Sequence, residues 1–155
     1  MDAYDTFLTG EAPLYTTEQL EEAMQRAMDS YAGGIGSYYR FNGKQLAKAK
    51  ARIEELIGMA EQLKAENLHD LLFIYELKER LVVCLTLIAH LGARKETRWH
   101  SFAENLDYPE TSDEWLCYVN SVATDKGIEI RQRPLVTSDS YKHQDGAAVS
   151  KGGAL

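Results

Sequence analysis

The sequence predicts an all-α fold, an up-down three-helix bundle with an irregular C-terminal extension. Three observations predict it: apolar residues recur at helical spacing in three segments, turn signals separate these segments, and the periodicity stops after His100. A length of 155 residues suits one domain. We expect an irregular N-terminal arm over residues 1–15, the bundle over 16–100, an extension packing on it over 101–136, and a flexible tail over 137–155.

The first two helices each show one apolar face. Thr16 and Thr17 offer a cap for the first helix, which ends at Gly33-Gly34, and Asn42 can cap the second. The first apolar series has steps of three and one residues, so that alternate members are four apart: Leu20, Ala23, Met24, Ala27, Met28 and Tyr31. The second has steps of three and four: Leu46, Ala49, Ile53, Leu56, Ala60 and Leu63. Such spacing predicts helices that pack through a single side.

The third helix is expected from about Leu68 to about Lys95, after a short break at Asn67. Apolar residues nearly encircle it between Leu71 and Leu91, which predicts a central helix packed on both sides. Because the break before it is short, the second and third helices should run antiparallel.

The extension carries one clear turn signal. Thr124–Gly127 reads Thr-Asp-Lys-Gly, and the flanking Val119–Val122 and Ile128–Ile130 alternate weakly, which predicts a small β-hairpin. The segment Asp113–Val119 is compatible with either a short helix or a strand. From Thr137 onward the residues are mostly small or polar, which predicts flexibility unless a partner holds them.

Charge and composition exclude several classes of function. The net charge is −7, with 24 acidic against 17 basic residues, which argues against nucleic acid or an anionic membrane as the main partner. No stretch approaches the ~20 apolar residues of a membrane span. The acidic N-terminus lacks the apolar segment of a signal peptide, so we expect a cytoplasmic protein. Two distant cysteines, Cys84 and Cys117, form neither a disulfide framework nor a zinc site.

No catalytic or metal-binding pattern is found. Gly33–Gly36 is rich in glycine, but a phosphate loop follows a strand, and here a helix precedes it, so a helix stop is preferred. No Ser-His-Asp or Cys-His pair is indicated by local context. No two histidines have the i, i+4 spacing of a helical metal site: His69, His90, His100 and His143. We therefore expect no catalytic residue, no metal and no cofactor bound by this chain alone.

The segment Arg94–His100 concentrates basic and aromatic groups directly after the third helix. Cations at a helix C-terminus interact favourably with the helix dipole, which explains one or two of them. The helix dipole does not explain the aromatic residues that gather nearby: Trp99, Phe102, Tyr108, Trp115 and Tyr118. Arg and Trp are enriched at interface hot spots, so we predict that this surface docks a partner or another domain.

Several segments resemble the C-terminal region of the fumarate reductase and succinate dehydrogenase flavoprotein superfamily. Within it, the greatest resemblance is to the flavoprotein (alpha) subunit of adenylylsulfate reductase. The similar segments follow the family's order and together span roughly residues 17–136: Met28–Gly34, Asn67–Leu71, Arg94–Trp99, Asp107–Pro109, Asp113–Ser121 and Arg131–Val136.

The resemblance implies a spectrin-repeat-like three-helix domain. Larger members carry an FAD-binding domain upstream, and many pair with an iron–sulfur subunit, so FAD is implied for the parent enzyme or a partner subunit. In the family the segment corresponding to Arg94, Glu96 and Arg98 packs the helical domain against the flavin domain. The expected docking residues are therefore Arg94, Glu96, Arg98, Trp99, Asp107, Tyr108 and Trp115.

Two positions depart from the family pattern, because many relatives have a glycine soon after the second arginine and an arginine where Asn105 stands. Trp99-His100-Ser101 replaces that glycine, which argues against close approach of this loop to substrate. The leading hypothesis is a non-catalytic helical domain or small subunit of a FAD-dependent oxidoreductase. The alternative is an independent helical protein–protein interaction module that also uses Tyr38, Tyr39 and Phe41. An enzyme acting alone is the third and weakest reading.

Overall fold

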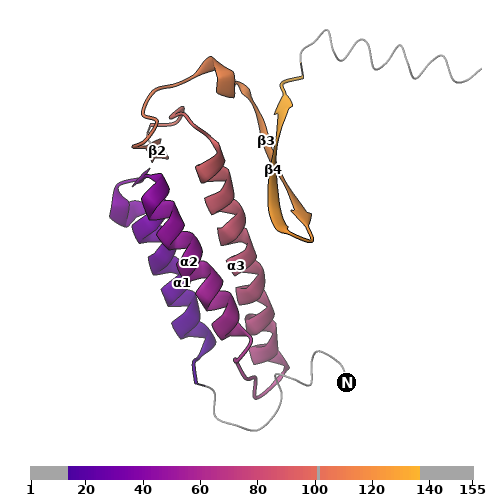
Figure 1. Cartoon of the computed structure of the whole chain (residues 1–155). Helices are drawn as coiled ribbons and strands as arrows, with labels where there is room; N and C mark the ends of the chain where they lie inside the picture. Colours follow the sequence, from indigo (N-terminus) through magenta and orange to yellow (C-terminus); the bar gives the residue numbers. More distant parts are fainter. Residues whose placement is uncertain (1–13, 101, 137–155) are drawn as a thin grey trace, which may run out of the picture.

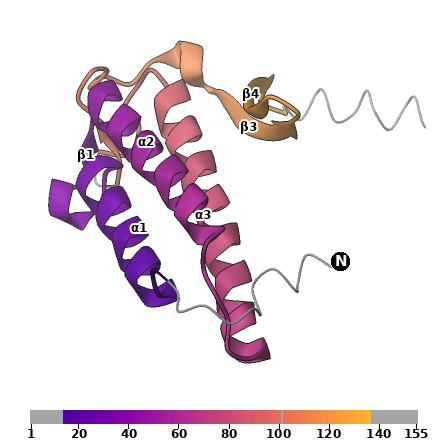
Figure 2. The same cartoon turned by 60° about the horizontal axis from the view of Figure 1, so that its bottom comes forward.

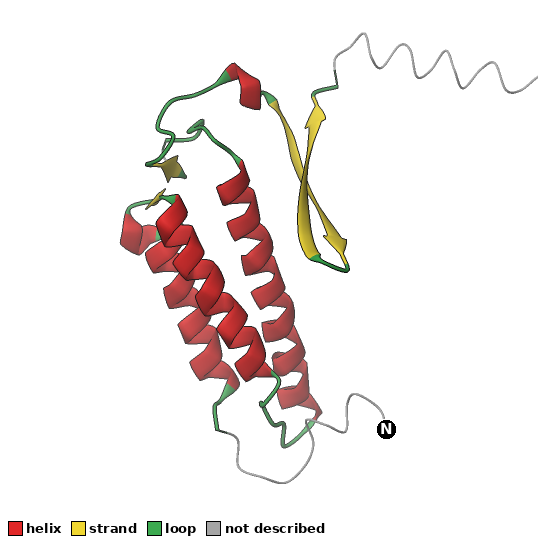
Figure 3. Cartoon of the chain, in the orientation of Figure 1, coloured by secondary structure: helices red, strands yellow, loops and turns green. Residues whose placement is uncertain are grey.

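The computed structural model describes residues 14–100 and 102–136, and its main body is three packed helices. Helices α1 (Thr17–Tyr31), α2 (Gly43–Ala60) and α3 (Leu68–Ala93) run up, down and up (Figure 1). Two small two-stranded sheets accompany them, so the all-α prediction is only approximate (Figure 3).

Each helix begins at a polar residue that satisfies the free N–H groups of its first turn. The Thr16 hydroxyl accepts from the Gln19 N–H, and the Gln19 side chain accepts from the Thr16 N–H in return. The Asn42 side chain caps α2 in the same way, and the Asn67 side chain accepts from two backbone N–H groups of α3. The helix starts predicted from these residues are thus confirmed.

The central helix is α2, and the prediction that α3 is central was wrong. Helix α2 packs on both other helices, while α1 and α3 touch each other less. Helix α3 buries one stripe and leaves several apolar residues on other sides exposed. The largest fully buried apolar side chains come from all three helices and the α2–α3 connection: Leu20, Ile53, Leu56, Leu63, Ile74, Leu77 and Leu81. The periodicity of apolar residues shows which face of a helix is apolar, but it does not show which neighbour covers that face.

The first sheet joins the α1–α2 connection to the segment after α3. Strand β1 (Arg40–Phe41) pairs in parallel with β2 (Glu104–Asn105). The Arg40 guanidinium also forms an ion pair with the Glu104 carboxylate, at 2.8 Å. The Phe41 side chain is buried in the core, so this pairing closes the upper end of the helices.

The second sheet is the predicted hairpin, which is confirmed and longer than expected. Strands β3 (Cys117–Thr124) and β4 (Gly127–Pro134) pair antiparallel, and Thr124 faces Gly127 across the turn. A 3-10 turn, η2 (Asp113–Trp115), precedes β3, so this segment contains both a short helical turn and the start of a strand. The hairpin contacts α3 and lies beside it (Figure 1).

Several sequence predictions concern residues outside the described ranges. These include almost all of the N-terminal arm, the tail over 137–155, and His143. Within the described ranges, no helix is both long enough and apolar enough to cross a bilayer. Cys84 and Cys117 are free thiols, and burial within α3 raises the pKa of the Cys84 thiol, which makes it less reactive.

Replacing Leu77 tests the core. Leu77 is completely buried in α3, so Leu77→Ala should lower the free energy of unfolding by about 2–5 kcal/mol through lost transfer energy and a cavity. Urea denaturation followed by circular dichroism measures it. The control Leu68→Ala removes the same atoms from an exposed position of the same helix and should change it by less than about 0.5 kcal/mol. Equal losses in the two variants would contradict this packing.

Candidate functional site

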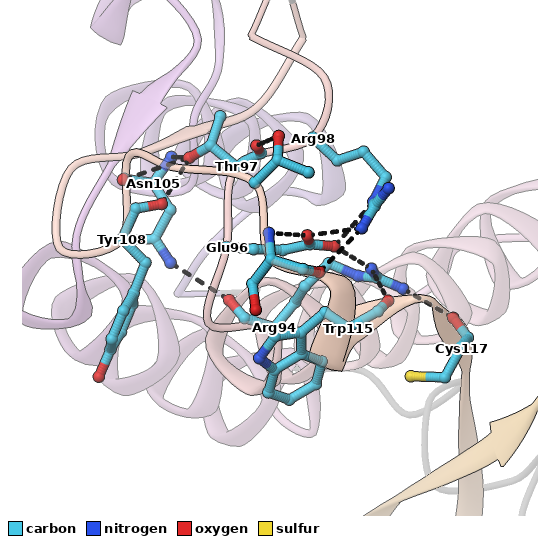
Figure 4. A network of polar contacts seen from close by, with 10 residues as sticks. Arg94, Glu96, Thr97, Arg98, Asn105, Tyr108, Trp115 and Cys117 are labelled. Atoms are coloured by element: carbon cyan, nitrogen blue, oxygen red, sulfur yellow. Dashed lines mark hydrogen bonds and ion pairs between the residues drawn. The ribbon is translucent and has the colours of Figure 1, made fainter.

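The candidate site is centred on Glu96, whose side chain is fully buried just beyond the end of α3. Its carboxylate accepts hydrogen bonds from Arg98 Nε at 3.0 Å and Arg98 Nη2 at 2.9 Å, and it contacts Arg94 Nη1. The backbone N–H of Ser112 adds a further bond at 3.0 Å. Figure 4 shows the carboxylate between the two guanidinium groups. A buried charge with this many donors is fully compensated.

These contacts fix the ionisation of Glu96. Burial alone raises the pKa of its carboxyl, but the hydrogen bonds from Arg98, Ser112 and Arg94, with the positive charge of Arg98, outweigh burial. The net result lowers the pKa of Glu96 from its usual 4.5 to about 2. The same bonds raise the pKa of Arg98. The cluster is therefore ionic at every physiological pH and carries one net positive charge.

The two guanidinium groups also hold the chain that leads into the hairpin. Arg94 donates to the carbonyl oxygens of Trp115 at 2.9 Å and Cys117 at 3.1 Å, and its guanidinium lies 6.0 Å from the centre of the Trp115 ring. Arg98 donates to the Ser112 carbonyl oxygen at 3.0 Å. Their side chains are 30% and 29% exposed, so these cations act mainly within the chain.

A second network, which the sequence reasoning missed, surrounds the buried Thr97. Its hydroxyl donates to the Tyr108 carbonyl oxygen at 2.8 Å and accepts from the Asn105 N–H at 2.9 Å. The Asn105 side-chain amide donates to the Arg94 carbonyl oxygen at 3.3 Å (Figure 4). These bonds join residues eight to eleven positions apart in an aperiodic segment, so no local pattern indicates them.

Asp107, one of the predicted docking residues, makes a contact within the chain. Its carboxylate accepts from the N–H of Gly43, the first residue of α2, at 2.7 Å. A carboxylate at a helix N-terminus interacts favourably with the helix dipole and satisfies a free donor. Asp107 thus ties the segment after α3 to the start of α2.

The remaining predicted residues border a cavity of about 400 Å3. Trp99 is 68% exposed and Trp115 is half-buried, and both line this cavity together with Arg94, Arg98 and His90. Tyr108 is exposed nearby in sequence but does not line it. The structure therefore brings together Arg94, Glu96, Arg98, Trp99 and Trp115, and it places Tyr108 and Asp107 outside this group.

The glycine cluster does not fit a phosphate group. The Gly36 N–H already donates to the Asp29 carboxylate at 2.9 Å, and a Cβ at Gly34 or Gly36 would clash with Asp29. A carboxylate in that position takes a donor that a phosphate would need and repels it. Over residues 14–100 and 102–136, no three His, Cys, Asp or Glu side chains converge as a metal site would require.

Comparison by sequence and comparison by structure find similarity to the same kind of protein. No family model matches the chain. The alpha subunit of adenylylsulfate reductase from Megalodesulfovibrio gigas is 32% identical over 97 residues, which cover 62% of this chain and 15% of that subunit.

Solved structures extend the similarity to most of the chain. Adenylylsulfate reductase from Archaeoglobus fulgidus superposes with a TM-score of 0.77 and 31% identity over 83% of this chain. An adenosine-5-phosphosulfate reductase in complex with sulfite gives 0.75 and 34% over 79%. The quinol fumarate reductase of E. coli gives 0.70 and 20% over 84%, which shows a shared fold. This chain spans 20%, 20% and 23% of those three chains.

Neutralising Glu96 tests the ionic cluster. At neutral pH, Glu96→Gln should lower the free energy of unfolding by about 2–4 kcal/mol, because it leaves two guanidinium groups without their counter-charge. Because the folded pKa lies below the unfolded one, this contribution is complete above about pH 4.5 and is lost as the pH falls toward about 2. Urea titrations at several pH values measure both effects.

The control for this prediction is Glu55→Gln, which removes a surface carboxylate paired with Arg52 and should cost less than about 0.5 kcal/mol. A difference between the native protein and Glu96→Gln that stays constant from about pH 7 to about pH 2.5 would contradict the ionised, buried carboxylate.

Removing the Thr97 hydroxyl tests the second network. Thr97→Val keeps the shape but leaves the buried Asn105 N–H without an acceptor, so the free energy of unfolding should fall by about 1–3 kcal/mol. Thermal or urea unfolding measures it. Thr86→Val, which removes a hydroxyl bonded to the Val82 carbonyl oxygen on the side of α3, should have a much smaller effect. A neutral Thr97→Val would show that the hydroxyl is dispensable.

Proposed function

Because the chain is homologous to the alpha subunit of adenylylsulfate reductase, we propose that it is a non-catalytic helical domain or small subunit of a FAD-dependent oxidoreductase of the adenylylsulfate and fumarate reductase type. Its role is to support the flavin-binding domain or the contacts between subunits. FAD belongs to the flavin-binding polypeptide, and an iron–sulfur subunit is a further partner in the proposed cytoplasmic assembly.

The observation that carries this proposal is that the charged groups near Glu96 are engaged in hydrogen bonds within the chain. A catalytic site needs donors and acceptors that remain available to a substrate. Here the Glu96 carboxylate accepts from three residues, and Arg94 and Arg98 both donate to it and to backbone carbonyl oxygens. That these charged groups are used largely in contacts within the chain supports a positioning role for the cluster.

The segment that the cluster holds carries exposed apolar and aromatic side chains, here together called the shoulder and defined as Trp99, Phe102, Tyr108 and Leu116. All four side chains are exposed, and all lie in the segment between α3 and the hairpin. Residues held in place before binding lose less entropy when a partner docks, and Trp and Tyr are typical anchors. The shoulder is therefore the proposed contact with the flavin-binding polypeptide.

The alternative, an independent helical interaction module, has one observation in its favour. Tyr38 is exposed in the connection between α1 and α2, and both it and Tyr39 adopt a left-handed backbone conformation. Such conformations in residues other than glycine often accompany function. In this alternative a partner binds the Tyr38 side of the molecule and no flavoprotein is involved.

Capture of a flavoprotein tests the proposal. The full chain, tagged, is co-produced with the Megalodesulfovibrio gigas alpha subunit from which the matching segment has been deleted, and the captured FAD is measured by absorbance. We expect capture of the FAD-containing subunit by the native chain. Trp99→Ala with Tyr108→Ala should weaken capture about tenfold or more, because both remove exposed aromatic anchors.

Tyr38→Ala is the control, since it truncates an exposed aromatic residue that is not part of the shoulder. It should leave capture unchanged. A native chain that captures no flavoprotein would contradict the proposal and favour the independent module, and capture that depends on Tyr38 alone would reject the shoulder as the contact.

A further inference from the structure

Helix α3 carries an apolar stripe that remains exposed among the described residues. The stripe, here called the outer face of α3, consists of Leu68, Leu72, Val83 and Leu87, whose side chains are between 48% and 77% exposed. Steps of four and eleven residues return to nearly the same side of a helix, so all four lie on one side of α3. Exposed apolar side chains that gather on one side of a helix, here as two pairs, mark an interaction site more often than scattered residues do.

The rest of the fold covers other sides of α3. The buried stripe of α3, which includes Ile74, Leu77 and Leu81, packs within the three helices. The tip of the hairpin, at Ile128, shares a cavity with Leu85 and Ala89 of α3 and with residues of α2. Figures 1 and 2 show the hairpin beside only the C-terminal half of α3. Leu87 borders a hollow together with Met28 and Ile35. Leu68, Leu72 and Val83 are more than half exposed.

The outer face is continuous with the proposed docking region. His90, one turn beyond Leu87, lines the cavity that Arg94 and Trp99 also border. One partner surface could therefore span the shoulder and the outer face together. This continuity sets the outer face apart from exposed apolar residues elsewhere on the molecule.

The charges on this face define the chemistry of its partner. Glu76 and Glu79 lie between Leu72 and Val83 on the same side of α3. Glu76 is paired with Arg80 at 3.1 Å, whereas Glu79 has no hydrogen bond or ion pair within the described residues. An apolar stripe with a negative centre is complementary to an apolar surface that carries Lys or Arg at its middle.

A second copy of the chain is a poor occupant. A symmetric dimer through this face would bring the two Glu79 carboxylates together, because Glu79 lies near the midpoint between Leu72 and Leu87. Like charges placed opposite each other at an interface are strongly unfavourable. The relatives offer another occupant, since this chain corresponds to about a fifth of their length and the remaining polypeptide is much larger.

We propose that the outer face of α3 is a second docking surface for the flavin-binding polypeptide, which meets it with an apolar surface and a basic residue opposite Glu79. This inference rests on the proposed function and adds the partner's chemistry and a face outside the Glu96 cluster. The apolar residues supply the area that becomes buried on docking, and Glu79 selects the orientation of the partner.

Two variants test the outer face in the capture experiment with the segment-deleted Megalodesulfovibrio gigas alpha subunit. Val83→Glu should weaken capture about tenfold or more, because it puts a charge into the apolar contact. Glu79→Lys should weaken it about three- to tenfold, by setting like charges opposite each other. The controls are Leu14→Glu and Glu55→Lys, which make the same changes at exposed positions outside this face and should stay within about twofold of the native chain.

The outcomes separate this inference from the proposed function. Native capture with loss in both variants supports the outer face, provided that circular dichroism shows the variants folded. Native capture that neither variant weakens overturns the outer face and leaves the proposed function standing. No native capture overturns both. A dimer of the chain that Val83→Glu dissociates, measured by analytical ultracentrifugation, overturns the flavin-binding polypeptide as occupant in favour of a second copy.

Discussion

The upper end of the molecule depends on keeping the Glu96 carboxylate ionised in a buried position. Removing a carboxylate from water is costly, and the cost is offset here only because Arg94, Arg98 and the Ser112 N–H converge on it. Those guanidinium groups reach on to carbonyl oxygens at Ser112, Trp115 and Cys117. One buried charge thereby fixes where the chain leaves α3 and where the hairpin begins.

The other contacts of this end extend the same constraint to α1 and α2. The Thr97 hydroxyl bonds to the backbone of Asn105 and Tyr108 and so holds the loop that contains them. The Asp107 carboxylate accepts from the first N–H of α2. The β1–β2 pairing adds the connection that follows α1. All three helices are therefore held relative to the shoulder by polar contacts as well as by the apolar core. A surface fixed in this way is suited to docking a large partner with little loss of entropy.

The sequence predicted the features that arise from short-range contacts and missed those that depend on distant ones. Thr16, Asn42 and Asn67 cap helices through residues two or three positions away, and the hairpin turn is equally local. Arg94 and Arg98 stood out by residue type, but their partners lie two to twenty-three positions away in an aperiodic stretch. No periodicity records such contacts, so their role within the chain could not be anticipated. The placement of α3 failed for a related reason, because a pattern of apolar residues does not name the neighbour that covers them.

The exposed side of α3 and the ionic cluster together bear on whether this unit is self-sufficient. A buried ion pair is weak evidence for stability, and replacing it with apolar residues is often neutral or stabilising. An uncovered apolar stripe is a liability for an isolated protein. Both features are unfavourable for an independent domain. Both become favourable when another polypeptide binds the shoulder in its fixed position and covers the apolar stripe. The arrangement around Glu96 and along α3 therefore favours a unit that works within a larger assembly over a free-standing module.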